Sequence, residues 1–350
     1  MRRKLRMGVV GVGMGKNHAK GFQSHPAAEL VALCDMDEKR LNAVASELNV
    51  PERYTDVKAM LRQAKLDAVG VATPNKFHAP VTIAALNAGL HVLCEKPMAM
   101  NAKEAAKMNA AARKARKNLM INFSYRFSDM SHALKHQVDA GLIGDIYYGR
   151  TVWHRRRSGI ITGGKASFVT KEISGGGPLI DLGVHRLDLA LWLMGYPEPV
   201  AVSGSAYDLL AKRIAKDKKR PISVEDLACG IVKFKNGATL IVEASWALNI
   251  PEREHMVTTL CGTKGGLVQK NTDGGYSFTA EVYTDEDGHL FTKTLDWSEV
   301  SSPTPYHEFI NSILEKRPPL ATGEEGLKVM KILDGIYRSA DTGREVRYGK

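Results

Sequence analysis

Residues 91–97, which read HVLCEKP, indicate both the class of fold and the position of a binding site. A short apolar run ends there in an acid, a base and a proline, and such runs are typical of buried parallel strands. In an open α/β sheet, ligands bind outside the carboxyl ends of the strands, so we expect Glu95 and Lys96 at the mouth of a binding crevice. Lys96 is a candidate acid or base because lysine shifts its pKa readily when it is partly buried. The alternative is a surface ion pair beside a turn.

A glycine-rich loop near the N-terminus supplies a second signal. Residues 5–15 read LRMGVVGVGMG, so a valine-rich strand runs into Gly11, Gly13 and Gly15 before an amphipathic segment begins at Lys16. Glycines allow a tight turn and let backbone N–H groups approach a pyrophosphate at a helix N-terminus. The pattern departs from G-x-G-x-x-G, because its sixth position is Lys16 and the loop is one residue short.

An acid follows the next predicted strand, which covers residues 29–34. Asp35 is placed where a carboxylate would hydrogen-bond the adenosine ribose of NAD. Asp37 follows closely, and both charges would repel a 2′-phosphate, so NAD is expected in preference to NADP. Two basic residues after them weaken that preference. In the alternative interpretation Asp35 or Asp37 caps the following helix, since Glu38 completes a capping-box pattern with Asp35.

The order of the predicted elements divides the chain at residue 123. Up to that point five strands alternate with helices, which indicates a doubly wound parallel sheet in a domain of residues 1–123. In residues 124–350 a helix near 125–140 is followed mostly by strands, for which antiparallel pairing is expected. These strands are predicted at 145–154, 200–208, 225–235, 238–247, 256–261, 265–270, 276–283 and 289–295, and two closing helices near 305–316 and 323–340.

One helix interrupts the strand-rich half. The glycines at 175–177 let the backbone pass close to something bulky, and Pro178 suits a first helical turn. Asp181, His185 and Asp188 follow at the spacing that places side chains on one helix face. A histidine there can accept a proton at neutral pH, and an aspartate can orient it or a nearby ammonium group. No further ligand cluster supports a metal site, and a plain helix-surface Asp/His pair is the alternative.

Composition excludes several classes of protein. The 350 residues are too many for one ordinary core and suit two domains. The formal net charge is +11, but the basic residues are spread along the chain without zinc-finger spacing or an RNP-like motif, so no nucleic-acid partner is expected. No stretch approaches the ~18 apolar residues of a membrane helix. The four cysteines form no CxxC motif, which favours reduced thiols in a cytoplasmic protein.

Together these residues resemble the Gfo/Idh/MocA oxidoreductases, the family of glucose–fructose oxidoreductase and inositol dehydrogenase. The resemblance covers nearly the whole chain. It rests on the following motifs: the Gly11–Gly15 loop with His18, Thr73-Pro74-Asn75 with His78, Ala88-Gly89 before Glu95-Lys96-Pro97, Asp181-x-Gly183-x-His185-x-x-Asp188, and the 305–309 and 323–326 segments.

The resemblance implies a Rossmann domain followed by a domain with a large, open, mostly antiparallel sheet. It also implies a nicotinamide cofactor in the cleft and a homo-oligomer, dimer or tetramer, built through that sheet. Lys96, Asp181 and His185 match catalytic positions of the family. Asn75 and Glu95 match positions that hold the nicotinamide half. The full set of expected cofactor contacts is Gly11, Gly13, Met14, Gly15, Asp35, Thr73, Pro74, Asn75, His78, Glu95, Lys96 and Arg126, the last at a position near the cleft.

The function that follows is hydride transfer between nicotinamide and a secondary alcohol carbon of a sugar, a cyclitol or a derivative. The hydroxyl must lose its proton as the hydride leaves, and His185 is the candidate base. Lys96 would stabilise the developing oxygen charge, and Asp181 would orient Lys96 or bind a substrate hydroxyl.

The expected substrate contacts are Lys96, Tyr125, Trp153, His154, Arg155, Asp181 and His185. Trp153 or Phe168 could stack on a sugar ring. The arginines at 155–157 could select a carboxylate or phosphate, or else face solvent or cover the cofactor. Two other functions remain open: an NAD-dependent glycosidase on the same scaffold, and a non-catalytic protein that senses NAD.

Overall fold

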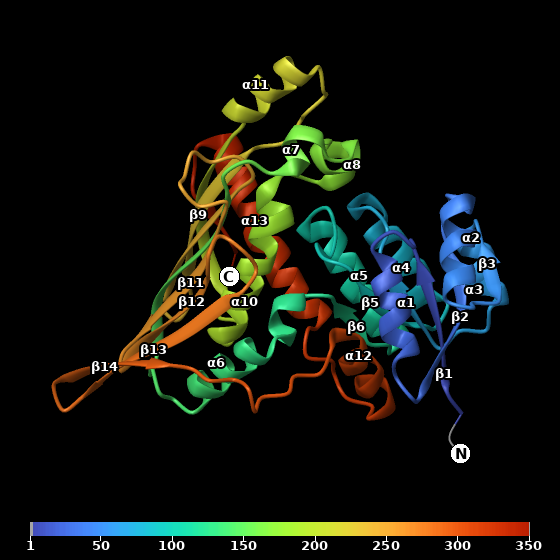
Figure 1. Cartoon of the computed structure of the whole chain (residues 1–350), viewed down its shortest axis with the longest axis horizontal. Helices are drawn as coiled ribbons and strands as arrows, with labels where there is room; N and C mark the ends of the chain where they lie inside the picture. Colours follow the sequence, from blue (N-terminus) through green and yellow to red (C-terminus); the bar gives the residue numbers. More distant parts are fainter. Residues whose placement is uncertain (1–2, 350) are drawn as a thin grey trace. The chain divides into compact units, whose positions relative to one another are not determined.

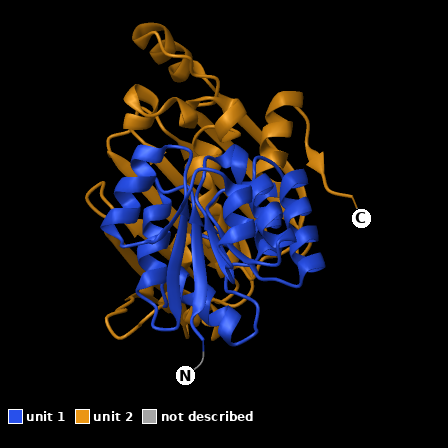
Figure 2. Cartoon of the chain, turned by 90° about the vertical axis from the view of Figure 1, so that its right-hand side faces the viewer, with its two compact units in different colours: residues 1–123, 303–330 blue, residues 124–302, 331–350 orange. Residues whose placement is uncertain are grey.

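The computed structural model describes residues 3–349 and divides into two compact units (Figure 2). Of these residues, unit 1 consists of 3–123 with 303–330, and unit 2 of 124–302 with 331–349. The division differs from the one expected at residue 123, because the segment 303–330 packs with the first unit.

Unit 1 is built on a parallel sheet of six strands in the order β3-β2-β1-β4-β5-β6. Its strands are β1 (Leu5–Val10), β2 (Ala28–Cys34), β3 (Glu52–Tyr54), β4 (Ala68–Val71), β5 (His91–Cys94) and β6 (Leu119–Ile121). The short strand β3 was not predicted. The strand order reverses between β1 and β4, and in open α/β sheets a ligand crevice forms at that point.

Helices connect the strands of unit 1. They are α1 (Gly15–Gln23), α2 (Glu38–Glu47), α3 (Val57–Gln63), the 3-10 turn η1 (Asn75–Phe77), α4 (His78–Asn87), α5 (Ala102–Ala115), α12 (Pro305–Leu314) and the first part of α13 (Gly323–Thr342). Asn101 caps α5 by accepting from the Glu104 N–H at 2.9 Å, as its sequence pattern predicts. Asp37 caps α2, and Asp35 does not.

Residues from the far end of the chain complete the core of unit 1. Phe309 of α12 is fully buried, and its ring centroid lies 6.2 Å from that of Phe22 in α1. Tyr306 packs over Gly21, where a Cβ atom would overlap its ring. These contacts are the reason that the segment 303–330 belongs to the first unit.

Unit 2 is built on a sheet of nine strands in the order β14-β13-β12-β11-β7-β10-β9-β8-β15. The pairing is antiparallel except between β7 and β10, so the predicted pairing is confirmed. Its strands are β7 (Ile146–Arg155), β8 (Pro199–Tyr207), β9 (Leu227–Phe234), β10 (Thr239–Ser245), β11 (Glu254–Gly262), β12 (Gly265–Asn271), β13 (Phe278–Glu286), β14 (His289–Thr294) and β15 (Val346–Arg347).

The helices of unit 2 include several that the sequence did not indicate. They are η2 (Ser124–Phe127), α6 (Asp129–Asp139), α7 (Gly159–Gly163), α8 (Ala166–Val169), α9 (Lys171–Ser174), the π-helical turn η3 (Leu179–Gly183), α10 (Val184–Leu193), α11 (Leu209–Lys218) and the later part of α13. The single helix expected over 125–140 is divided at Ser128, whose side chain caps α6.

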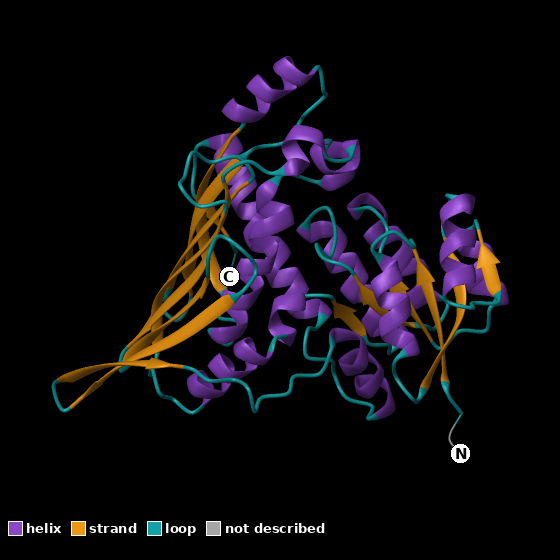
Figure 3. Ribbon diagram, in the orientation of Figure 1, coloured by secondary structure: helices purple, strands orange, loops and turns teal. Residues whose placement is uncertain are grey.

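The helices α10 and α13 lie on one face of the nine-stranded sheet (Figures 1 and 3). Gly204 and Gly230 admit Ile336 of α13, since a Cβ atom at either position would stand under 3 Å from it. Trp246, which is fully buried, belongs to the hydrophobic core of this unit. Among residues 3–349, no helix is long and apolar enough to cross a membrane.

Candidate functional site

The glycine loop after β1 has the geometry of a phosphate-binding turn. Gly11 has φ +85°, and a Cβ atom there would stand 2.6 Å from the Ala72 carbonyl oxygen. A Cβ atom at Gly15 would stand 2.8 Å from Val9 Cγ1, so this glycine allows close packing of α1 on β1. Gly15 therefore allows the close packing of helix on strand that the third glycine of G-x-G-x-x-G usually allows, although it comes one residue early. Met14, at the N-cap, makes no side-chain cap hydrogen bond, and the Asn17 N–H donates to the Met14 carbonyl at 3.0 Å, so no side chain of the loop caps this helix N-terminus, where an anion can bind.

Asp35 follows β2, but its carboxylate is already engaged. It accepts hydrogen bonds from the N–H groups of Val12 (2.8 Å) and Asp37 (2.9 Å) and from Nε (3.2 Å) and Nη2 (2.8 Å) of Arg40. Burial raises its pKa, but the Arg40 and backbone hydrogen bonds outweigh burial and leave the pKa below its usual value. A carboxylate has about four acceptor positions, so Asp35 holds the loop, and a ribose contact stays a prediction.

The carboxyl ends of β4 and β6 present buried polar atoms that have no protein partner. They are Thr73 Oγ1, after β4, and Asn122 Oδ1, after β6. Buried polar atoms are seldom left unsatisfied. Together with the uncapped α1 terminus, they fit a polar cofactor that lies along this edge of the sheet.

Glu95 is the centre of a buried network at the same edge. Its Oε1 atom lies 2.8 Å from His18 Nε2 and accepts a hydrogen bond from Asn122 Nδ2 at 2.7 Å. Its Oε2 atom accepts from the Lys96 N–H at 3.2 Å. Burial raises the pKa of Glu95, but hydrogen bonding and charge at His18 outweigh it and hold the pKa at about 2. Glu95 is therefore an anion that fixes the backbone at Lys96.

His78 joins two loops at this edge and is not available to the cofactor through either ring nitrogen. Nδ1 lies 2.7 Å from the Pro97 carbonyl oxygen, and Nε2 lies 2.8 Å from that of Thr73. The side chain is 1% exposed. We therefore revise its predicted cofactor contact: His78 clamps the loop after β4 to the turn after β5, which carries Lys96.

In unit 2, Asp181 lies in the π-helical turn η3, and His185 lies in the first turn of α10. The Asp181 carboxylate accepts a hydrogen bond from the Trp246 indole at 3.2 Å, and its N–H donates to the Gly177 carbonyl at 3.1 Å. Asp188 is not part of this group, because it pairs with Arg126. The residues that the sequence placed on one helix face therefore lie in two environments: Asp181 beside Trp246, and Asp188 in an ion pair with Arg126.

His185 is surrounded by aromatic rings. Its ring centroid lies 5.2 Å from Tyr125 and 5.7 Å from Trp153, and these two rings are themselves 5.7 Å apart. Burial raises the pKa of Tyr125 to about 12, so its hydroxyl stays protonated at neutral pH. The structure therefore brings together three of the predicted substrate residues.

Arg155 extends this cluster, and its charge is compensated. Its guanidinium carbon lies 5.3 Å from the Trp153 ring centroid, and Nε lies 2.9 and 3.0 Å from the two Glu254 oxygens. Glu254 also accepts from the Trp153 indole at 2.8 Å, and Arg155 Nη2 donates to the Tyr276 hydroxyl at 2.7 Å. Burial lowers the pKa of Arg155, but Glu254, Tyr276 and, more weakly, Asp181 raise it above its usual value.

His154 does not belong to the cluster, contrary to prediction. Its ring stacks with that of His255 (centroids 6.3 Å apart), and Nε2 lies 3.5 Å from a Glu243 oxygen. Side chains alternate between the two faces of a strand, so the neighbours Trp153 and Arg155 point to the opposite side of β7.

Arg126 is likewise assigned a structural role instead of the predicted cofactor contact. It is 1% exposed; Nη2 donates to Asp188 at 2.7 Å and to the Tyr196 hydroxyl, and Nε donates to Asp188 at 2.9 Å. A buried guanidinium requires an anion, and this pair ties η2 to α10.

The sequence reasoning missed the residues that hold these side chains in place. In unit 1 they are His18 and Asn122, of which only His18 had been noted, as part of the family motif. In unit 2 they are Trp246, Glu254 and Tyr276, which lie at strand ends or in a loop. Their spacing along the chain carries no signal, because only the folded sheets bring them to the site.

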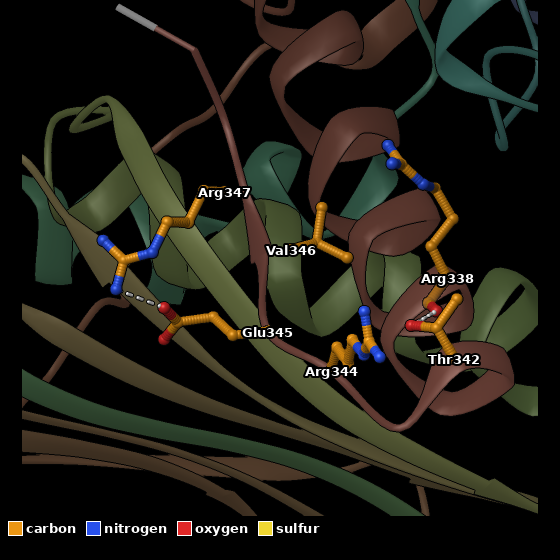
Figure 4. A pocket seen from close by; sticks show the side chains of 6 residues that line it. All are labelled: Arg338, Thr342, Arg344, Glu345, Val346 and Arg347. Atoms are coloured by element: carbon orange, nitrogen blue, oxygen red, sulfur yellow. Dashed lines mark hydrogen bonds and ion pairs between the residues drawn. The ribbon is translucent and has the colours of Figure 1, made fainter.

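Two surface hollows lie in unit 2. One, of about 480 Å³, is lined by Arg338, Thr342, Arg344, Glu345, Val346 and Arg347, and none of the predicted site residues lines it (Figure 4). The other, of about 660 Å³, has Tyr125 in its wall beside Phe127, Tyr276, Phe278 and Trp297. Within residues 3–349, no three His, Cys, Asp or Glu side chains are grouped to hold a metal ion.

Comparison with known families matches both parts of the chain. The model of an oxidoreductase family, described as an NAD-binding Rossmann fold, matches residues 5–123, and the model of its C-terminal alpha/beta domain matches residues 135–348. D-glucoside 3-dehydrogenase of Escherichia coli (strain K12) is 35% identical, over 98% of this chain and 97% of its own. D-xylose 1-dehydrogenase (NADP(+)) 2 of Haloferax volcanii is 29% identical, over 97% and 98%.

A solved structure of levoglucosan dehydrogenase in complex with NADH superposes with a TM-score of 0.86. Its sequence identity is 24%, and the match covers 99% of each chain. At that identity the likeness shows the fold, and it confirms the predicted combination of a Rossmann domain with a large, mostly antiparallel sheet.

Proposed function

Because the chain belongs to the Gfo/Idh/MocA oxidoreductase family, we propose that it transfers a hydride between nicotinamide and a secondary alcohol carbon of a sugar, a cyclitol or a derivative. Family membership makes the chain an oxidoreductase with an NAD-binding Rossmann domain, as the sequence predicted. The name of the 35% identical relative favours a glucoside as substrate.

The chain's own residues manage the proton and the charge on oxygen, while bound NAD supplies the hydride acceptor. His185 takes the hydroxyl proton, because a neutral imidazole is a base near pH 7. Lys96 stabilises the negative charge that develops on the oxygen. Asp181, which Trp246 holds, binds a neighbouring hydroxyl of the substrate. The expected backbone contacts to NAD are those of the Gly11–Gly15 loop, with Thr73, Pro74 and Asn75 after β4.

The observation that supports this proposal most directly is the grouping of Tyr125, Trp153 and His185 with Arg155 beside them. Aromatic rings next to a base suit a sugar, whose C–H face packs on a ring while its hydroxyls meet polar groups. The charge of Arg155 is offset by Glu254. We therefore favour a neutral substrate over one with a carboxylate or phosphate.

A panel of substrates tests the proposal. Free sugars, glucosides, inositols and their acidic or phosphorylated forms are incubated with NAD and with NADP, and NADH or NADPH absorbance is followed. We expect a neutral glycoside to be oxidised with NAD at the highest kcat/KM. A preference for the phosphorylated form would contradict the assignment of Arg155, and reduction of NAD by none of the panel would contradict the function.

The variant Lys96→Ala tests the role of the lysine. We expect turnover to fall on the order of 10²- to 10³-fold, as for loss of one group that stabilises an oxyanion. NAD affinity, measured by fluorescence titration, should change little. Lys76→Ala, at a lysine that follows β4 whereas Lys96 follows β5, is the control and should keep full turnover. Unchanged turnover in Lys96→Ala would refute the role of Lys96.

The names of the relatives give no support to a glycosidase or to a non-catalytic NAD sensor. Release of an aryl aglycone without net NADH would be the sign of the former. We further propose that the protein is cytoplasmic, since its four cysteines are free, and that it forms a homo-oligomer through the nine-stranded sheet.

A further inference from the structure

A buried carboxylate stands at the start of the segment that carries Asp181 and His185. Glu225, just before β9, is 8% exposed. Its Oε2 atom accepts a hydrogen bond from the Gly177 N–H at 2.8 Å, and its Oε1 atom accepts from the Leu179 N–H at 3.2 Å and from the Tyr337 hydroxyl at 2.8 Å. None of the ion pairs described within residues 3–349 includes Glu225, and its carboxylate is held by peptide N–H groups and one phenol.

The glycines before η3 are explained by this arrangement. A Cβ atom at Gly177 would overlap the Glu225 carbonyl oxygen and stand 3.0 Å from its carboxyl carbon. A Cβ atom at Gly176 would overlap the Tyr337 hydroxyl. The bulky groups that the sequence led us to expect beside these glycines are therefore Glu225 and Tyr337.

Hydrogen bonds lead from this point to Asp181 by two routes. On the backbone side, Gly177 donates to Glu225 through its N–H and accepts from the Asp181 N–H through its carbonyl. On the side-chain side, the Asp226 carbonyl accepts from the Trp246 N–H at 3.0 Å, and the Trp246 indole donates to the Asp181 carboxylate. The consecutive residues Glu225 and Asp226 thus fix both the main chain and the carboxylate of Asp181.

We propose that Glu225 and Tyr337 are positioning residues that set the π-helical turn η3, and through it Asp181 and His185, in the geometry that the reaction requires. π-Helical turns occur frequently at functional sites, and a displacement of about 1 Å in such a site can cost on the order of 10²-fold in rate. Burial raises the pKa of Tyr337 well above its usual value, which keeps this hydroxyl a donor. This inference rests on the proposed function, because the proposed function assigns the chemistry to Asp181 and His185.

The variants Tyr337→Phe and Glu225→Gln test the proposal, with Tyr348→Phe as the matched control. Tyr348 also presents a partly buried hydroxyl in unit 2, which donates to the Lys331 carbonyl of α13 at 2.6 Å. For Tyr337→Phe we expect kcat to fall on the order of tenfold or more, with less change in KM and in NAD affinity. Tyr348→Phe should keep kcat within about twofold, even where the two variants lose similar thermal stability.

A double-mutant cycle shows whether Glu225 and Tyr337 act together or independently. The losses in kcat of Glu225→Gln and Tyr337→Phe should be less than additive, since both disturb one hydrogen-bonded group. Tyr337→Phe removes the donor to Glu225 Oε1, and the amide NH2 that Glu225→Gln introduces cannot accept from the backbone as the carboxylate does. Wild-type kcat in Tyr337→Phe, or a loss of kcat that follows the melting temperature in both tyrosine variants, would overturn the proposal.

Amide hydrogen exchange of the peptide 177–186 decides the question independently of activity. Exchange should be at least about tenfold faster in Tyr337→Phe than in the wild type and unchanged in Tyr348→Phe. Should the wild type oxidise none of the sugars, the proposed function fails, while this measurement still shows whether Glu225 and Tyr337 hold the segment. Unchanged exchange in Tyr337→Phe would remove the inference even if the enzyme is active.

Discussion

The Asp35 carboxylate shows that a side chain at a predicted ligand position can already be engaged by groups of the protein. Its position after β2 is that of a ribose-binding acid, yet Arg40 and two backbone N–H groups occupy its oxygens. The Arg40 side chain remains 41% exposed, and it also lies 3.5 Å from Asp37. Arg40 therefore offsets much of the negative charge that would repel a 2′-phosphate.

Removal of Arg40 should sharpen the preference for NAD. In Arg40→Ala the two carboxylates lose their cation, so we expect the ratio of the NADP to the NAD dissociation constant to rise about tenfold, or ~1.4 kcal/mol. Fluorescence titration with both nucleotides measures this ratio. Lys39→Ala, at an exposed neighbouring cation, should change it less. An unchanged ratio in Arg40→Ala would show that Asp35 and Asp37 do not face the ribose.

At the scale of elements, Glu95 connects α1, β5 and the end of β6 through His18, its own turn and Asn122. Because its pKa of about 2 lies below the usual 4.5, the folded state favours the charged form. The stability that this provides is fully present above pH 4.5 and is lost as the pH falls through about 2.

The variant Glu95→Gln should make this contribution visible. We expect the free energy of unfolding at pH 7 to fall by about 3 kcal/mol, and its dependence on pH between 5 and 2 to flatten. Urea denaturation over that pH range is the measurement. Glu47→Gln, at an exposed pair with Lys16, serves as the control and should change the pH profile much less, because solvent screens that pair. A Glu95→Gln profile parallel to the wild type would contradict the assignment.

At the scale of the whole molecule, residues almost three hundred positions apart share one core. Phe22 and Phe309 pack in unit 1, although one follows the glycine loop and the other precedes the last helix. Phe309→Ala should therefore destabilise the Rossmann unit by about 3–5 kcal/mol, as a buried cavity does. Chemical denaturation tests this against Phe291→Ala, whose ring is 43% exposed. Equal small losses in both would show that α12 is not part of this core.

The outer face of the nine-stranded sheet is the expected contact between copies of the chain. Ile231, in β9, is 45% exposed on this sheet, and exposed apolar side chains on an open sheet favour association. Ile231→Lys should shift the protein toward smaller species in sedimentation velocity, whereas Lys233→Ala on the same strand should not. A wild-type distribution in Ile231→Lys would place the contact elsewhere.

The sequence by itself determined the main elements, because their signals are local. Apolar runs that end in turn residues marked five parallel strands, Asn101 and Gly89 marked helix boundaries, and Asn236-Gly237 marked the β9–β10 hairpin. The family motifs identified the oxidoreductase class for the same reason, since each is a short run with fixed spacing. The short strand β3 and the helices between 159 and 174 have too few residues to leave a periodic pattern.

Only the tertiary structure decided which candidate residues share a site. Adjacent residues on β7 pointed to opposite faces, so Trp153 and Arg155 joined His185 while His154 did not. Arg126 pairs with Asp188, and His78 lies within hydrogen-bond distance of two carbonyl oxygens, to one of which its neutral ring donates. No spacing in the chain reveals these partners. The physical reason is that hydrogen bonds and ion pairs depend on distance in space, and in this chain the decisive partners lie from five to more than a hundred residues apart.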